Sequence, residues 1–182
     1  MVNIYKLKLT SLQHMILRLL FINAGIPLNQ RQIANRLEVS QPAVMKALPG
    51  LEKEGLILSQ QDKESRRWSI QLNRDDRMVL ALKRVDNLKQ VYESGLANFL
   101  EAKFPGDTII LFGSYARGED TAGSDIDIAV IGSKEKDVDL TRLEKALERT
   151  ININFFESFK NVHKHLKENL CNGIVLVGGI EL

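Results

Sequence analysis

The chain has 182 residues, of which 44% are hydrophobic and 26% charged, a composition suited to one large or two small globular domains. Its single cysteine, Cys171, excludes an internal disulfide and a cysteine metal site, and we expect it at a buried helix position. No signal peptide and no membrane-length apolar run is recognisable, so we expect a cytoplasmic protein without membrane partners.

The net charge of +2 is unevenly distributed. Residues 1–73 carry ten Lys/Arg against five Asp/Glu, whereas residues 74–182 carry fifteen against eighteen. A basic first part favours contact with nucleic acid. The mildly acidic remainder argues against a large DNA surface there.

Three short helices are predicted first, over residues 10–23 and then after Asn29 and Ser40, which are suitable N-caps. Their apolar residues fall at helical spacing. Pro49 and Gly50 lie late in the third helix. Because proline inside a helix removes a hydrogen bond at a cost of ~3 kcal/mol, we expect a kink or an end near Leu48.

Two short strands follow, residues 56–58 and 68–72, joined by a polar loop. Helix, helix, turn, helix and hairpin is the order of a winged helix-turn-helix. The chain resembles winged-helix regulators of the MarR and ArsR types over roughly residues 10–72. The wording that carries this resemblance is Ile33-Ala-x-x-Leu37, Val39-Ser40-Gln41-Pro42-Ala43-Val44 and Leu51-Glu-Lys-Glu-Gly-Leu-Ile57.

This resemblance implies DNA binding, with the third helix in the major groove and the wing on the backbone. The residues that would face bases are Ser40, Gln41, Ala43 and Lys46, and those that would meet phosphates are Lys63, Arg66 and Arg67. The alternative is a module that binds protein or dimerises.

A long linker helix is predicted over residues 74–104, capped by Asn73, and Gly95 can bend or split it. Its apolar stripe would pack against the domains or form a homodimer seam. The stripe consists of Met78, Leu82, Val85, Leu88, Tyr92, Leu96 and Phe99. We therefore expect a winged-helix domain at 1–73, this linker at 74–104 and a second domain at 105–182.

The second domain begins with a buried strand over residues 108–112, a turn at Gly113 for which Ser114 is a suitable helix cap, and a strand over 126–131. Asp125 and Asp127 are two residues apart, so they point to the same face of that strand. Two carboxylates beside a turn that can hold phosphate are what magnesium-dependent phosphoryl transfer needs.

The glycine spacing of residues 113–118 matches a P-loop, but Glu119 and Asp120 follow where Lys and Ser/Thr are required. Instead, Gly113-Ser114, ten further residues and Asp125-x-Asp127 resemble the minimal nucleotidyltransferase family of the DNA polymerase β superfamily. Other residues that fit the family wording are Phe112, Tyr115, Ala116, Arg117, Gly118 and Ser124.

The resemblance implies an α+β protein whose C-terminal domain has a small mixed sheet flanked by helices. Active family members hold two Mg²⁺ ions with three carboxylates and bind a nucleoside triphosphate. Carried over, Asp125 and Asp127 are the catalytic, metal-binding pair. Nucleotide contacts would come from Gly113, Ser114, Arg117 and Ser124.

The third carboxylate is expected on the strand over residues 150–156, where Asn152 and Asn154 occupy the polar face. Asparagine offers a metal an oxygen but no charge and no base, so a complete two-metal site is in question. Glu157 has the wrong strand parity unless a twist brings it round. Helices at 140–149 and 158–169 and a strand at 174–177 complete the prediction.

Two functions stay open. The first is an enzyme that transfers a nucleoside monophosphate to an acceptor. The second is a DNA-binding transcriptional regulator whose degenerate domain senses nucleotide, dimerises or acts as an antitoxin, because such domains often pair with a helical toxin. The sequence does not name the acceptor, nucleotide, operator or oligomeric state.

Overall fold

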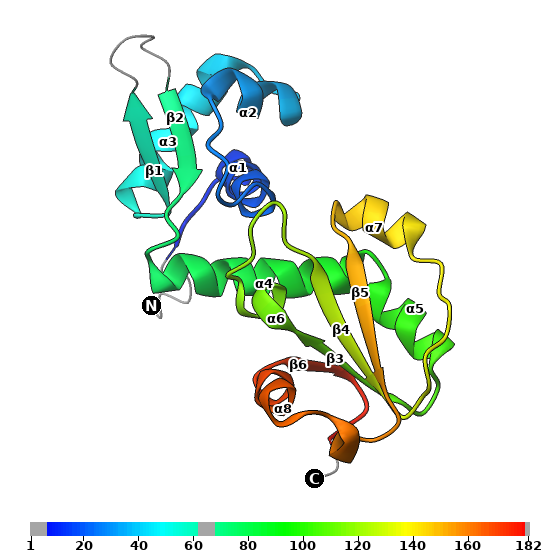
Figure 1. Cartoon of the computed structure of the whole chain (residues 1–182). Coiled ribbons are helices and arrows are strands. Elements are labelled where there is room, and N and C mark those ends of the chain that lie inside the picture. The colour runs from blue at the N-terminus through cyan, green and yellow to red at the C-terminus, as the bar shows by residue number, and fades with distance from the viewer. Residues whose placement is uncertain (1–6, 62–67, 181–182) are drawn as a thin grey trace, which may run out of the picture. The chain divides into compact units, whose positions relative to one another are not determined.

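The computed structural model describes residues 7–61 and 68–180. The chain divides into two compact units, Met1–Val79 and Leu80–Leu182. Figure 1 shows the elements of both units.

The first unit contains α1 (Ser11–Ile22), α2 (Gln30–Arg36), α3 (Gln41–Lys53) and the antiparallel strands β1 (Ile57–Gln61) and β2 (Trp68–Leu72). Thr10 and Asn29 close capping boxes with glutamines three residues later, and Ser40 caps α3 through the amide of Ala43. Leu28 adds a backbone bridge to Ile70. This is the winged helix-turn-helix that the sequence predicts.

The expected end of α3 near Leu48 is wrong, because the helix continues through Pro49 to Lys53. Tertiary contact overrides the local preference here. Gln13 of α1 donates to the carbonyl of Ala47 at 3.0 Å, and a Cβ on Gly50 would lie 2.3 Å from the Gln13 amide nitrogen. Glycine at position 50 thus lets α1 approach the α3 backbone closely.

The linker consists of two helices, α4 (Arg77–Glu93) and α5 (Leu96–Lys103), divided by Gly95 in a left-handed conformation. The expected cap is wrong. Asp76 accepts from the amide of Met78 at 2.7 Å, while the Asn73 amide donates to the carbonyl of Gly55.

The predicted apolar stripe is only partly buried within the chain, and a homodimer seam formed by its exposed residues stays a prediction. Val85 is 67% exposed, and Met78 and Tyr92 are exposed as well. In the second unit, the buried positions of this helix include Lys83 and Asn87. Because these buried residues are polar, the spacing of apolar residues alone does not identify the buried face of the helix.

The second unit is built on a four-stranded sheet of order β5-β4-β3-β6. Strand β3 (Thr108–Phe112) is antiparallel to β4 (Ile126–Ile131) and β6 (Ile174–Val177), and β4 is parallel to β5 (Ile151–Phe156). The mixed sheet therefore agrees with the predicted fold class.

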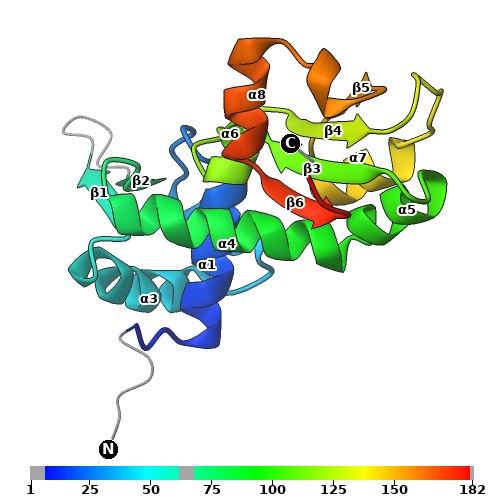
Figure 2. The same ribbon diagram turned by 90° about the horizontal axis from the view of Figure 1, so that it is seen from below.

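Helices cover both faces of this sheet (Figures 1 and 2). On one face, Ile126, Ile128 and Ile151 pack with apolar residues of α4, α5 and α7 (Thr141–Leu147). On the other, Ile110 and Ala129 pack with residues at and near α8 (Lys164–Cys171). A short 3₁₀ helix, η1 (Phe159–Asn161), precedes α8, so the predicted helix over 158–169 is divided. Cys171 is exposed, which corrects the expected buried position.

Candidate functional site

The paired aspartates lie at the end of the sheet where strand β3 finishes and strand β4 begins. The register places Phe112, the last residue of β3, opposite Asp127, and Asp127 opposite Asn152 of the parallel neighbour β5. Because alternate residues share a face, Asp125, Asp127 and Asn152 lie on the face opposite Ile126 and Ile151. The predicted parity of both strands is thus confirmed.

Gly113 brings its backbone directly against Asp127. It has φ +75°, in the region that favours glycine, and begins the short helix α6 (Gly113–Arg117). A Cβ at this position would lie 2.3 Å from Oδ2 of Asp127. The glycine turn and the second aspartate are therefore in contact, as a joint site requires.

The Asn152 amide nitrogen donates to Oδ2 of Asp125 at 3.0 Å. Burial raises the pKa of the Asp127 carboxyl, and the negative charge of Asp125 adds to that rise, while the Asn152 amide opposes it. A divalent cation would offset the repulsion between these two neighbouring carboxylates, one of which is partly desolvated.

Among residues 7–61 and 68–180, no three His, Cys, Asp or Glu side chains group closely enough to hold a metal ion. Glu157 follows the far end of β5 and pairs with Lys134 at 3.5 Å. Glu157 lies five positions beyond Asn152, a span of about 16 Å along the strand, so a twist does not bring it to the aspartates.

Asn154 also lies outside the cluster. It is opposite Ala129 in the sheet and lines a separate hollow with Ser133 and Lys134. Of the two asparagines proposed from the sequence, the structure brings only Asn152 together with Asp125 and Asp127.

Of the other predicted nucleotide contacts, Arg117 and Ser124 have local partners. Ser114 lies inside α6 rather than capping it, since Phe112 occupies the N-cap without a side-chain hydrogen bond. Arg117 pairs with Glu119 at 2.7 Å. The Ser124 hydroxyl accepts from the Thr121 amide at 2.9 Å and so closes the turn before Asp125.

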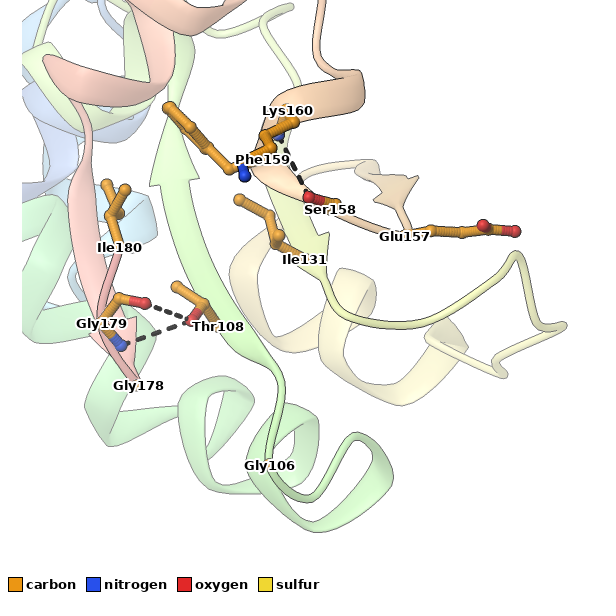
Figure 3. Close-up of a pocket in the computed structure, with 10 residues that line it drawn as sticks. All are labelled: Gly106, Thr108, Ile131, Glu157, Ser158, Phe159, Lys160, Gly178, Gly179 and Ile180. Atoms are coloured by element: carbon orange, nitrogen blue, oxygen red, sulfur yellow. Dashed lines mark hydrogen bonds between the residues drawn. The ribbon is translucent and has the colours of Figure 1, made fainter. Parts of the chain in front are cut away.

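A cavity of about 550 Å³ lies at the opposite ends of strands β3 and β4 (Figure 3). Its walls include Thr108 at the start of β3, Ile131 at the end of β4, and Gly179, whose carbonyl accepts from the Thr108 hydroxyl at 2.7 Å. It is separate from the aspartates because they lie at the other ends of these two strands.

Sequence reasoning missed a cluster of buried polar side chains, which consists of Lys83, Asn87, Asp120 and Arg149. Lys83 and Asp120 form an ion pair of 2.5 Å, each residue being 1% exposed. Burial lowers the pKa of the Lys83 ammonium although Asp120 opposes this shift. The available signal was the i, i+4 spacing of Lys83 and Asn87 on one side of α4.

In the first unit, Ser40, Gln41 and Lys46 are exposed and Ala43 is half-buried at the start of α3. The Ser40 hydroxyl accepts from the Ala43 amide at 3.3 Å, so its first role is the helix cap. The predicted wing residues Lys63, Arg66 and Arg67 lie outside the described residues.

Comparison with known proteins agrees with both units. Residues 93–177 match the family model of the nucleotidyltransferase domain, and residues 9–68 match that of the MarR family. The chain therefore combines an N-terminal MarR-type winged-helix domain with a C-terminal nucleotidyltransferase domain. No curated protein matches the chain.

Solved structures similar to the chain include the S. aureus MepR–DNA complex, with 27% identity, TM-score 0.38, and 52% of this chain and 78% of that chain covered. AdcR from Streptococcus pyogenes has 23% identity, TM-score 0.43, and coverage of 57% and 72%. The zinc-responsive MarR family member ZitR of Lactococcus lactis has 25% identity, TM-score 0.41, and coverage of 57% and 68%.

No helix in the described part of the chain is both long and apolar enough to cross a membrane.

Proposed function

We propose that the protein is a DNA-binding transcriptional regulator whose nucleotidyltransferase domain binds a nucleoside triphosphate with Mg²⁺ and senses it without efficient transfer. The contact between the Gly113 turn and Asp127 is the observation that carries the nucleotide part of this proposal. The MarR-type domain carries the DNA part.

The proposed ion lies between the side chains of Asp125 and Asp127. Carboxylate oxygens are preferred ligands of Mg²⁺, and the ion usually also binds substrate phosphates instead of a complete protein cage. The Gly113 backbone lies directly beside Asp127, so phosphates bound to this ion would lie close to the Gly113 turn. A magnesium-bound triphosphate is therefore the ligand that suits the site formed by Asp125, Asp127 and the Gly113 turn.

Weak or absent transfer follows from Asn152. The asparagine lies where the neighbouring strand would supply a third acid, and its amide hydrogen-bonds to Asp125. It provides neither negative charge for a second ion nor a base for the attacking hydroxyl. A positioned general base typically contributes ~10²–10⁴-fold to a rate.

DNA would bind through the start of α3. Gln41 is exposed there and can hydrogen-bond to a base edge, and exposed Lys46 can neutralise a phosphate. A homodimer would place two such helices on two half-sites. Sedimentation of the full chain with and without DNA tests that assembly.

Calorimetry with ATP, GTP, CTP and UTP in Mg²⁺ tests the ligand. We expect at least one nucleotide to bind, Asp127→Ala to abolish binding, and the exposed Glu135→Ala to retain it as a control. If no nucleotide binds to the folded protein, the proposal fails.

Nucleotide transfer is the second candidate, and the two carboxylates beside Gly113 favour it. Incubation with labelled nucleotide, Mg²⁺ and candidate acceptors distinguishes the two functions. Transfer that requires Asp125 and Asp127 would establish an enzyme. Binding without transfer would support the regulator.

A further inference from the structure

The loop from Gly118 to Asp125 delivers the first aspartate to the site, and it has no regular secondary structure. A residue that binds metal must nevertheless be held in one position. The contacts that hold this loop are made mainly with α4, outside the site itself.

The first contact is made by Gly118, which has φ +75°. A Cβ here would lie 2.3 Å from the Leu80 carbonyl oxygen and 2.7 Å from the Arg84 backbone nitrogen. The loop therefore leaves α6 with its backbone pressed on the backbone of α4.

The second contact is made by Asp120, two residues further on. Its Oδ1 accepts from the Lys83 ammonium at 2.5 Å and from the Asn87 amide at 2.7 Å. Asn87 also donates to the Tyr115 carbonyl at 2.9 Å, so one side chain of α4 holds both α6 and the loop.

The cluster reaches the neighbouring strand as well. Arg149 lies 3.9 Å from the other oxygen of Asp120, and the next residue, Thr150, accepts from the Ile126 amide at 2.8 Å. Asp125 thus follows the buried Asp120, and Asn152 follows the buried Arg149, each within five residues.

A structural role alone explains this cluster poorly. Burying an ion pair costs several kcal/mol per ion, and replacing such a pair with apolar residues is often neutral or stabilising. The hydrogen bonds of an ion pair and an amide are, however, directional. They fix the orientation of the groups that they join, which apolar contacts do not.

We propose that Asp120, held by Lys83 and Asn87, is the positioning residue that fixes the loop carrying Asp125 for binding of the metal-bound nucleotide. The second half of this statement rests on the proposed function. The first half concerns the loop alone and can be measured without any ligand.

The test replaces the pair in the full chain with Lys83→Met/Asp120→Leu. Hydrogen exchange should become at least tenfold faster at the Thr121 and Ser124 amides, which close the turn before Asp125, and stay unchanged in β3 and β6. The dissociation constant for Mn²⁺ with nucleotide should rise at least tenfold.

A matched control is Lys89→Gln/Glu93→Gln, which removes an exposed ion pair of 3.5 Å from the same helix and should change neither measurement. Asn87→Ala removes three side-chain hydrogen bonds, to Lys83, Tyr115 and Asp120, and leaves the ion pair in place. This variant is used if the double variant does not fold.

Unchanged exchange at Thr121 and Ser124 in a folded variant would overturn the positioning role. Exchange that rises equally throughout the domain would also overturn it, because the cluster would then stabilise only the fold. If the wild-type chain binds neither Mn²⁺ nor nucleotide, the proposed function fails, whereas the exchange measurement still decides whether Asp120 positions the loop.

Discussion

At the scale of single residues, Gly113 is a position with little freedom to change. Gly113→Ala adds a Cβ 2.3 Å from Asp127 at a backbone angle of φ +75°, so we expect a loss of about 1–3 kcal/mol in unfolding free energy. Metal-nucleotide binding should be lost as Asp127 moves. Urea unfolding and calorimetry measure the two effects.

Gly123→Ala is the matched control, since a Cβ there meets nothing within 4 Å and no left-handed angle is required. Its unfolding free energy should stay within about 0.5 kcal/mol of wild type. Equal effects of the two substitutions would refute the close packing at Gly113.

Asp127 makes stability depend on pH. Burial raises the pKa of its carboxyl above the ordinary 3.8, so the folded state binds this proton more tightly than the unfolded state. The resulting cost to stability is present above the raised pKa and disappears as the pH falls through it.

We therefore expect Asp127→Asn to melt at a higher temperature than wild type at pH 7, with a difference that shrinks towards pH 3.8. Mg²⁺ with nucleotide should stabilise only the wild type and so reduce the difference in melting temperature at pH 7. Calorimetric melts across the pH range measure both effects. A gap that widens in acid would contradict the account.

Asn152→Asp supplies the carboxylate that the site lacks. At pH 7, Mn²⁺ should bind more tightly because a third negative charge faces the ion, while the metal-free protein should lose stability through repulsion with Asp125. Mn²⁺ titration and thermal melts measure the two effects. Unaltered metal affinity would show that Asn152 does not face the ion.

At the scale of elements, α3 offers a test of why Pro49 is tolerated. Pro49→Ala restores a backbone donor inside the helix, so we expect a gain of up to about 3 kcal/mol in the unfolding free energy of the first unit. Pro42→Ala, in the first turn, should change little because proline is compatible there. Fluorescence of Trp68, the single tryptophan, reports on this unit during urea unfolding.

The elements also show what the sequence can predict. Strand parity at Asp125, Asp127 and Asn152, and caps such as Ser40, depend on neighbours in the chain, and these predictions are confirmed. The continuation of α3 depends on Gln13, 34 residues away, and the buried face of α4 depends on Asp120. Such contacts are long-range, so local periodicity could not supply them.

At the scale of the whole molecule, the first unit should account for DNA affinity. The logarithm of the association constant should fall linearly with the logarithm of salt concentration, and Lys46→Ala should reduce that slope by about 1. Lys103→Ala, in the other unit, should leave it unchanged. Fluorescence anisotropy over a salt series measures the slopes, and equal slopes for wild type and Lys46→Ala would exclude this contact.

The central claim is that Asp125 and Asp127, beside the Gly113 turn, hold a divalent ion and its nucleotide. Electron paramagnetic resonance of Mn²⁺ titrated into the full chain with nucleoside triphosphate tests it most directly. We predict one protein-bound Mn²⁺ per chain, lost in Asp127→Ala and retained in Glu135→Ala. Mn²⁺ that stays free, or binds equally well to Asp127→Ala, would contradict the account.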